Sequence, residues 1–269
     1  TARAIQRALA ARPGPIAPLI AETGGQNAMI VDSSALPEQA VGDALLSAFN
    51  GAGQRCSALR ILCLQDDIAD RTLAMLAGAM EELRVGDPAR IETDIGPAID
   101  ADALKQWEAH IARMKSEAKF VAAAPLPKDL PRGGFYLAPH AFEIDAVARL
   151  EREVFGPILH VVRFSGARLE ALVDAINATG YGLTLGVHSR LDSTVDRVRR
   201  RARVGNLYVN RGMIGAVVGV QPFGGEGLSG TGPKAGGPLY VPRFAVERAV
   251  SVNTAAAGGN AALMALGEE

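Results

Sequence analysis

Two segments in the first quarter of the chain combine residue types that suit nucleophilic catalysis. Cys56 stands in Phe49-Asn-Gly-Ala-Gly-Gln-Arg-Cys-Ser-Ala58, beside Arg55 and just after the expected end of a helix. Glycines let a backbone approach a substrate closely, and a nearby cation or free backbone N–H groups lower the pKa of a thiol. The setting favours a nucleophile, although an isolated cysteine is more often a small buried residue.

The second segment, Glu22-Thr-Gly-Gly-Gln-Asn27, places a carboxylate before two glycines and an expected strand. Taken alone, Glu22 would be interpreted as a solvated or helix-capping carboxylate. A carboxylate near a cysteine nucleophile, however, suits a general base. The pair formed by Glu22 and Cys56, 34 positions apart (56 minus 22), therefore predicts more than either residue does.

Two later segments carry further carboxylate and aromatic groups. One is Glu151-Arg-Glu-Val-Phe-Gly-Pro157, in which a carboxylate suits a ribose diol, although the segment alone would be interpreted as a surface turn before a strand. The other is Gln221-Pro-Phe-Gly-Gly-Glu-Gly-Leu-Ser-Gly230.

In their order along the chain, the four segments resemble the signatures of the aldehyde dehydrogenase superfamily. The resemblance implies that Cys56 is the nucleophile and that Glu22 is the general base. It implies that Glu153 holds the hydroxyls of the nicotinamide ribose and that Phe155 packs near the nicotinamide. The cofactor is then NAD, with the cofactor-binding set Thr23, Gly24, Glu153 and Phe155, and Phe223 is expected in the aldehyde pocket.

The stretch from Val204 to Gly237 and the ending from Ser251 to Asn260 resemble one branch of that superfamily. This branch is the C-terminal L-glutamate γ-semialdehyde dehydrogenase module of bacterial proline utilization A, a family of bifunctional flavoenzymes. The resemblance implies NAD-dependent oxidation of L-glutamate γ-semialdehyde, the open form of pyrroline-5-carboxylate, to L-glutamate. FAD would belong only to the separate proline dehydrogenase module of such a parent protein.

The same resemblance implies a binding site for the α-carboxylate of the substrate. Ser57 would contribute its hydroxyl, and Gly215 and Ala216 would contribute backbone N–H groups. A plain loop turn is the alternative for the last two residues. Gly212 departs from the pattern of the branch, in which many relatives are expected to have asparagine.

The implied mechanism begins with addition of the Cys56 thiolate to the aldehyde carbon. A hydride then leaves the thiohemiacetal for NAD, and water activated by Glu22 hydrolyses the thioester. The backbone N–H of Cys56 would be one oxyanion donor. In the family the other donor is an upstream asparagine side chain, which would precede Thr1.

Other kinds of site find less support. His110, His140, His160 and His188 lie far apart, and the two cysteines do not form a Cys-x-x-Cys pair, so no metal site is predicted. A phosphate loop in 227–234 is rejected because Pro233 precedes the lysine and no Ser or Thr follows it. A Cys-His hydrolase is disfavoured because Glu22 supplies a base and the nicotinamide-type signatures have no role in hydrolysis.

Composition indicates a globular protein that acts on small molecules. The 269 residues are 48% hydrophobic, and 28 basic and 29 acidic residues give a net charge of -1. No positively charged surface that would attract nucleic acid is therefore expected. No apolar stretch approaches membrane-spanning length. Two cysteines, Cys56 and Cys63, fit the reducing cytoplasm, where we expect the protein to act.

Alternating apolar patterns predict an α/β fold with a mostly parallel sheet and helices on both faces. Expected helices are 1–12, 38–50, 73–83, 104–114, 169–176 and 191–203, and expected strands are 28–31, 60–64, 119–124, 135–137, 157–164, 183–188 and 206–210. The region from Leu239 to Val252 is expected to return to strands. Its part from Tyr240 to Asn253 resembles family dimerisation flaps, with an ordinary sheet edge as an equal alternative.

The resemblance divides the chain into three parts: the end of a Rossmann-type NAD-binding domain in 1–24, an aldehyde dehydrogenase catalytic domain in 25–228, and a return to the NAD-binding or oligomerisation region in 229–269. The start at Thr1 indicates an excerpt of a longer protein. The expected partners are the remainder of a parent chain or further copies of the chain. The alternative to an active dehydrogenase segment is an inactive structural or oligomerisation fragment.

Overall fold

The computed structural model describes residues 1–217, 219–253 and 265. The chain forms two compact units, Thr1–Gly237 and Pro238–Glu269. The first unit carries all of the candidate site residues and is built around one sheet.

The large sheet of the first unit has seven strands in the order β3-β4-β5-β2-β1-β7-β8. Every neighbouring pair is parallel except β3 and β4. A separate antiparallel pair joins β6 and β9. The strands are β1 Asn27–Val31, β2 Leu59–Gln65, β3 Lys119–Ala123, β4 His140–Glu143, β5 Ile158–Phe164, β6 Tyr181–Gly182, β7 Thr184–His188, β8 Asn206–Val209 and β9 Glu226–Gly227. The predicted α/β fold with a mostly parallel sheet is therefore confirmed.

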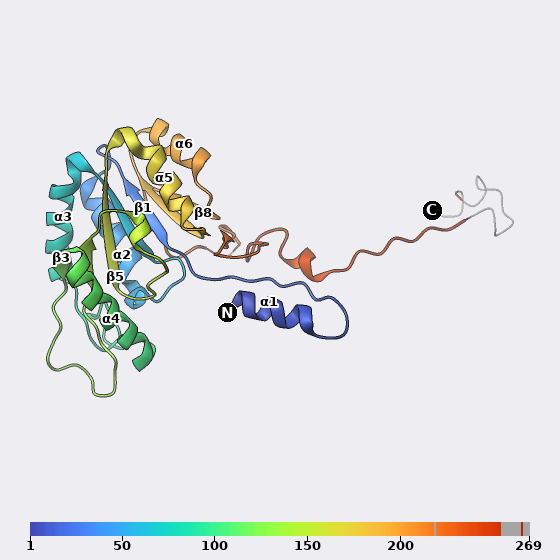
Figure 1. Ribbon diagram of the computed structural model, residues 1–269, viewed down its shortest axis with the longest axis horizontal. Coiled ribbons are helices and arrows are strands. Elements are labelled where there is room, and N and C mark those ends of the chain that lie inside the picture. The colour runs from blue at the N-terminus through green and yellow to red at the C-terminus, as the bar shows by residue number, and fades with distance from the viewer. Residues whose placement is uncertain (218, 254–264, 266–269) are drawn as a thin grey trace. The chain divides into compact units, whose positions relative to one another are not determined.

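Helices cover both faces of this sheet, as Figure 1 shows. The crossovers β1-α2-β2 and β7-α6-β8 run in opposite directions along the strand order, so right-handed connections place α2 and α6 on opposite faces. Helix α3 packs beside α2, and α5 packs beside α6. The α-helices are α1 Ala2–Ala11, α2 Pro37–Phe49, α3 Asp66–Glu81, α4 Ala101–Glu117, α5 Leu169–Ala178 and α6 Asp192–Arg201. Short 3-10 turns are η1 Asn50–Gly53, η2 Val147–Arg149, η3 Gly166–Arg168 and η4 Val241–Phe244.

The core lies where the apolar stripes of the helices meet the central strands. All five residues of β1 and the first six of β2 are buried, as expected of strands covered on both faces. Leu73, Leu76 and Met80 of α3 are buried, and so are Trp107, Ile111 and Met114 of α4. These stripes match the helical period predicted from the sequence.

Two predictions for the middle and end of the chain were wrong. Residues 135–137 do not form a strand; Phe135 makes only an isolated bridge to Ala98, and the strand that enters the sheet is β4. Its four residues are too few to give a clear alternation. Among residues 239–253, the expected strands are replaced by η4 and irregular chain, because Pro242 favours a turn and cannot donate to a ladder.

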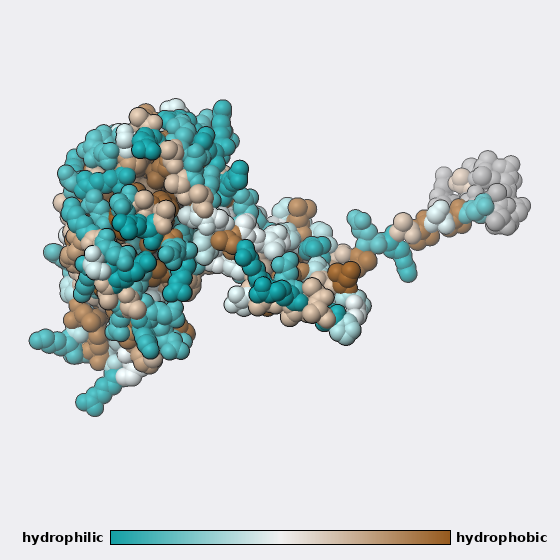
Figure 2. All heavy atoms as spheres, viewed as in Figure 1, coloured by the Kyte–Doolittle hydropathy of each residue, from teal (hydrophilic) through white to brown (hydrophobic). Residues whose placement is uncertain are grey.

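The described part of the second unit is short and exposed. The rings of Tyr240 and Phe244 lie 5.5 Å apart, edge to face, across η4. Val246, Val250 and Val252 are exposed, and the apolar residues of this unit are visible in Figure 2. Of the segment 251–260, which resembles proline utilization A, residues 254–260 lie outside the part of the chain that the structure describes.

None of the helices in the part of the chain that the structure describes is long and apolar enough to cross a membrane. Within the same residues, no three or more His, Cys, Asp or Glu side chains are grouped as a metal site would require.

Candidate active site

The loop from Glu22 to Asn27 connects all four of the segments that the sequence singled out. Glu22 forms a β-bridge with Gly230 of the fourth segment. The N–H of Gly25 donates to Oε2 of Glu153 in the third segment at 3.1 Å. Asn27 donates to the carbonyl oxygen of Cys56 in the second segment at 2.7 Å. Residues far apart in sequence are thus joined at one place in the fold.

The turn that carries Cys56 follows directly from α2. Gly51, Ala52 and Gly53 have φ values of 63°, 55° and 65°, so the chain leaves the helix through three left-handed residues. A Cβ on Gly53 would lie 2.4 Å from the carbonyl oxygen of Gly156, which makes glycine necessary there. The glycine-rich sequence therefore gives a tight turn that leaves Cys56 half-buried before β2 begins.

The electrostatic surroundings of the Cys56 thiol raise its pKa. Burial is the largest cause, and the carboxylates of Glu153 and Glu22 add to it, whereas hydrogen bonds from the N–H groups of Ser57 and Cys56 oppose it. Arg55, the cation expected to activate the thiol, is exposed and donates to Oδ1 of Asn50 at 3.0 Å. The expected lowering of the thiol pKa is wrong because burial outweighs the N–H donors.

Glu153 is a largely buried carboxylate at the centre of the site. Its Oε1 accepts from Nη2 of Arg60 at 3.0 Å, and the side chains are 12% and 2% exposed. A Cβ on Gly24 would lie 1.6 Å from Oε2 of Glu153, so the carboxylate occupies the space above this glycine. Burial raises the pKa of Glu153, and Arg60 and the Gly25 N–H oppose that rise. The structure thus brings the predicted cofactor residues Gly24 and Glu153 together.

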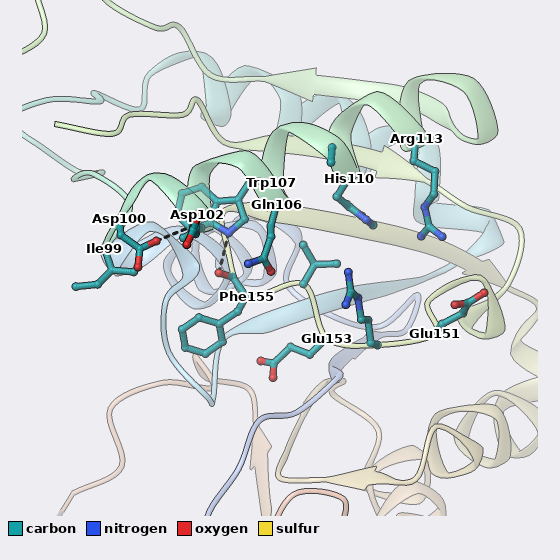
Figure 3. A pocket seen from close by; sticks show the side chains of 14 residues that line it. Ile99, Asp100, Asp102, Gln106, Trp107, His110, Arg113, Glu151, Glu153 and Phe155 are labelled. Carbon is teal, nitrogen blue, oxygen red and sulfur yellow. Dashed lines mark hydrogen bonds between the residues drawn. The ribbon is translucent and has the colours of Figure 1, made fainter. Parts of the chain in front are cut away.

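A pocket of about 710 Å³ opens between α4 and residues 151–155. Figure 3 shows Glu153 and Phe155 on one side of this pocket, with Gln106 and His110 of α4 on the other. Trp107 donates from Nε1 to the carbonyl oxygen of Phe155 at 2.9 Å and so ties the two sides together. Phe155 is 44% exposed. The pocket offers a carboxylate and an aromatic face, the groups that suit a ribose and a planar ring.

Thr23 and Phe223 lie in segments that hydrogen bonds hold to the chain between residues 228 and 235. The hydroxyl of Thr23 donates to the carbonyl oxygen of Leu228 at 2.5 Å, so it holds the fourth segment in place. Phe223 pairs with Ala235 through two backbone hydrogen bonds of 3.0 and 2.8 Å. Its ring is half-buried.

Within the part of the chain that the structure describes, no hydrogen bond joins Ser57 to Gly215 or Ala216, the other two residues expected to bind the substrate carboxylate. Ser57 is buried beside the thiol, and its carbonyl oxygen accepts from Thr184 at 3.3 Å. Gly215 has a φ of 75° and is exposed, and Ala216 is half-buried in the same turn. A carboxylate site at these three residues stays a prediction.

Asn27 and Arg60 are structural anchors of the site to which the sequence interpretation gave no role. Asn27 stands at the end of the quoted motif, which was the available signal. Arg60 interrupts the apolar strand Leu59-Arg-Ile-Leu-Cys-Leu-Gln65, and a buried charge of this kind needs a partner.

The half-buried cysteine, the two carboxylates and the mostly parallel sheet are features that a thiol-dependent enzyme with a cofactor pocket would need. Residues 1–250 match the aldehyde dehydrogenase family, and the chain belongs to that family.

Its relatives include the bifunctional protein PutA of Escherichia coli strain K12, 59% identical over 251 residues that cover 91% of this chain and 19% of the relative. The 1-pyrroline-5-carboxylate dehydrogenase of Geobacillus kaustophilus is 39% identical over 244 residues, which cover 89% of this chain and 46% of the relative. The chain therefore spans about a fifth of the length of this PutA and less than half of this dehydrogenase.

Solved structures agree in fold. A crystal structure of bifunctional proline utilization A is 61% identical and has a TM-score of 0.90. The match covers 96% of this chain and 26% of that protein. The 1-pyrroline-5-carboxylate dehydrogenase from Thermus with bound NAD is 38% identical and has a TM-score of 0.77, with 84% of this chain and 43% of that chain covered.

Proposed function

We propose that this chain carries the thiol and the general base of an NAD-dependent dehydrogenase that oxidises L-glutamate γ-semialdehyde to L-glutamate in proline catabolism. The observation that carries the proposal is the half-buried Cys56 thiol within the electrostatic reach of Glu22 and Glu153, on a turn fixed by Asn27. The names of the relatives, 1-pyrroline-5-carboxylate dehydrogenase and PutA, support the choice of substrate.

In the proposed reaction the Cys56 thiolate adds to the aldehyde carbon and forms a tetrahedral thiohemiacetal. Bound NAD supplies the hydride acceptor. Loss of the hydride leaves a thioester on Sγ, and water that gives a proton to Glu22 attacks its carbonyl carbon. The C–S bond then breaks, so that L-glutamate leaves and the thiol of Cys56 is regenerated. Glu22 is exposed, which leaves it accessible to water.

The residues of the pocket fit the nicotinamide riboside part of NAD. An ionised carboxylate has about four acceptor positions, and Arg60 and Gly25 occupy only part of those on Glu153. Three of these positions are filled, so one on Oε2 remains for a hydroxyl of the ribose, and the exposed Phe155 side chain suits packing beside the nicotinamide. Thr23 would contribute indirectly, by holding the loop at Leu228 in place.

The substrate proposal adds a carboxylate anchor made of the Ser57 hydroxyl and the N–H groups of Gly215 and Ala216. Phe223 would line the aldehyde pocket. We place the reaction in the cytoplasm, where the reducing environment keeps Cys56 a free thiol. The working form would be part of a longer polypeptide or an oligomer.

The test follows NADH absorbance with pyrroline-5-carboxylate, for this chain and for a form extended by its natural upstream sequence. Wild type, Cys56→Ala and Cys63→Ala are compared, because Cys63 is a buried thiol whose pKa burial raises to about 12. We expect turnover that is lost only in Cys56→Ala. An aldehyde that lacks the α-carboxylate should react more slowly. No NADH from either wild-type form would favour an inactive structural fragment and overturn the proposal.

A further inference from the structure

Arg60 is a buried arginine that donates to four different residues. It is 1% exposed. Nη1 donates to the carbonyl oxygens of Gly53 at 2.7 Å and Gly156 at 3.2 Å, and Nη2 donates to the carbonyl oxygen of Arg55 at 3.0 Å. Glu153 Oε1 accepts from Nη2 at 3.0 Å and from Nε at 3.4 Å.

These acceptors belong to two segments, the turn that carries Cys56 and residues 153–156. A hydride transfer depends on the distance between these two segments. The carbonyls of Gly53 and Arg55 lie in the turn immediately before the nucleophile, and Glu153 and Gly156 lie in the segment that lines the pocket. The Arg60 guanidinium also lies 5.2 Å from the centroid of the Phe155 ring. Because a guanidinium is planar and presents its donors in a fixed fork, it sets the separation of the two segments more rigidly than an ammonium group would.

The ion pair contributes little to the stability of the fold. Burial lowers the pKa of Arg60 and raises that of Glu153, so for each partner desolvation outweighs the attraction of the other. Buried pairs of this kind are a weak source of stability, and well-packed apolar residues often replace them without loss. A role in positioning the groups around it therefore explains the Arg60–Glu153 pair better than a role in stabilising the fold.

We infer that Arg60 is a positioning residue, which fixes the plane of the Glu153 carboxylate toward the cofactor ribose and ties that carboxylate to the turn that carries Cys56. With both positions of Oε1 filled by Arg60 and one position of Oε2 filled by the Gly25 N–H, the free lone pair of Oε2 has one orientation. This inference rests on the proposed function, because the ribose is the ligand that the carboxylate would receive.

The test is a double-mutant cycle in the longest natural polypeptide that carries this chain, with Arg60→Met, Glu153→Gln and the double variant. The dissociation constant for NAD is measured by titration without substrate, and the KM values for NAD and for pyrroline-5-carboxylate are measured separately. We expect Arg60→Met to weaken NAD binding about tenfold and to change the aldehyde KM less than about twofold. In the Glu153→Gln background, Arg60→Met should add less than about twofold.

Arg60→Lys keeps the charge but not the fork, so it should recover part of the NAD affinity that Arg60→Met loses. Arg163→Met is the matched control, because Arg163 is another strand arginine with two carboxylate partners, Glu143 and Asp70. It should leave the NAD dissociation constant within about twofold of wild type. If Arg60→Met fails to fold, Arg60→Lys replaces it in the cycle, since the charge of Glu153 then stays compensated.

Equal losses of NAD affinity in the wild-type and Glu153→Gln backgrounds would overturn the inference. So would a parallel rise of both KM values, because a residue with only a structural role would affect both ligands. In either case a wild type that binds NAD and turns over leaves the proposed function standing. A wild type that does neither overturns the proposed function and this inference together.

Discussion

Asn27 donates a hydrogen bond from Nδ2 to the carbonyl oxygen of Cys56 at 2.7 Å. The same amide donates to the carbonyl oxygen of Ala58 at 2.9 Å and accepts at Oδ1 from the N–H of Thr184 at 3.2 Å. Asn27 is the first residue of β1 and is 3% exposed. This one buried side chain at the start of β1 therefore ties the turn that carries Cys56 to the start of β7.

Asn27→Ala should destabilise the protein and also lower its activity. The change leaves two carbonyl oxygens and one N–H without their partner in a buried place, for which we expect a loss of about 2–4 kcal/mol in the free energy of unfolding. The Cys56 turn would lose its anchor, so kcat should fall at least about tenfold. Urea unfolding and NADH formation measure the two effects.

The matched control is Asn177→Ala. Asn177 also bridges backbone groups, with Nδ2 donating to Arg201 and Oδ1 accepting from Arg203, but these bonds are exposed to solvent. It should cost less than about 1 kcal/mol and leave kcat unchanged. Equal effects of the two substitutions on kcat would contradict the role given to Asn27.

Removing either neighbouring carboxylate should make Cys56 more reactive. Glu153 and Glu22 both raise the thiol pKa, so Glu153→Gln and Glu22→Gln should lower it toward its ordinary value. At pH 7.5 a larger fraction of the thiol is then ionised, and alkylation by iodoacetamide should accelerate about 2- to 10-fold, which corresponds to at most one pKa unit. The measurement needs no cofactor, and mass spectrometry identifies the alkylated cysteine.

Glu92→Gln serves as the control for this experiment. Glu92 is an exposed carboxylate paired with Arg90 and absent from the groups that act on Cys56. Its variant should be alkylated at the wild-type rate. The sign of the effect decides the matter: slower alkylation of Glu22→Gln would show that the carboxylate activates the thiol in the resting protein.

The sequence was sufficient for the parts of the site that depend on residue type and local turn chemistry. The glycines around Cys56 predicted a turn after α2, and the apolar runs predicted β1, β2 and β5 because strands buried on both faces are continuous hydrophobic segments. Parallel pairing then places the starts of β1 and β2 next to each other, with Asn27 opposite Leu59.

Other features depended on contacts that no local pattern encodes. The partner of Arg60 lies 93 positions away, and its effect on Glu153 follows only from how deeply both are buried. The sign of the Cys56 pKa shift was wrong for the same reason, since burial is a property of the folded chain. Strand β4 was missed because it gains its place by pairing with β3 and β5 rather than from its own four residues.

Gly24→Ala should displace the Glu153 carboxylate without unfolding the protein. The new Cβ would lie 1.6 Å from Oε2, the far end of a flexible side chain, which can move at low cost to the fold. Movement would break the bond to the Gly25 N–H. We expect the NAD dissociation constant to rise about tenfold, measured by titration, with a loss of stability of about 1–3 kcal/mol from the broken hydrogen bond to the carboxylate.

Gly78→Ala is the control for an added methyl group. Gly78 lies inside α3 with no atom within 4 Å of a new Cβ, so alanine should stabilise the helix by about 0.5–1 kcal/mol and leave NAD binding unchanged. An unchanged NAD affinity in Gly24→Ala would remove Glu153 from the cofactor site.

Gly212 allows a related test of the loop before the glycine-rich segment. A Cβ there would meet Oδ1 of Asp43 at 3.4 Å and Oγ of Ser47 at 3.5 Å, which are ordinary contacts. Gly212→Asn, which introduces the residue expected in many relatives, should therefore be accommodated with a change in unfolding free energy within about 1 kcal/mol. Urea unfolding checks this, and a larger loss would show that glycine is required at this position.

The hydrogen-bonded pair of half-buried His110 and buried His160 predicts a loss of stability in acid. Their Nε2 atoms lie 2.8 Å apart, and Nδ1 of His160 lies 3.1 Å from the carbonyl oxygen of Arg60. Because a carbonyl only accepts, Nδ1 of His160 carries the proton, and its Nε2 accepts from His110. Burial lowers the pKa of His160 to about 3 and that of His110 to about 4.

The direction follows from proton binding in the two states. An unfolded histidine takes up a proton near pH 6.5, whereas the folded pair stays neutral until the pH is much lower, so the unfolded state gains protons first and stability falls as the pH drops below 6.5. Each histidine contributes up to about 1.4 kcal/mol per pH unit. His160→Gln should therefore be less stable than wild type at pH 8, and the gap should narrow by about 1–2 kcal/mol at pH 5.

Urea unfolding at pH 8, 7, 6 and 5 measures this convergence. Thr72→Ala is the control, because it removes a buried hydroxyl that donates to Ile68 at 2.9 Å but does not titrate. Its loss of stability should be the same at every pH, in contrast to the converging curve of His160→Gln. Parallel curves for both variants would mean that His160 takes up its proton at the same pH in the folded and the unfolded protein, and the hydrogen bonds from Arg60 through His160 to His110 would have to be assigned differently.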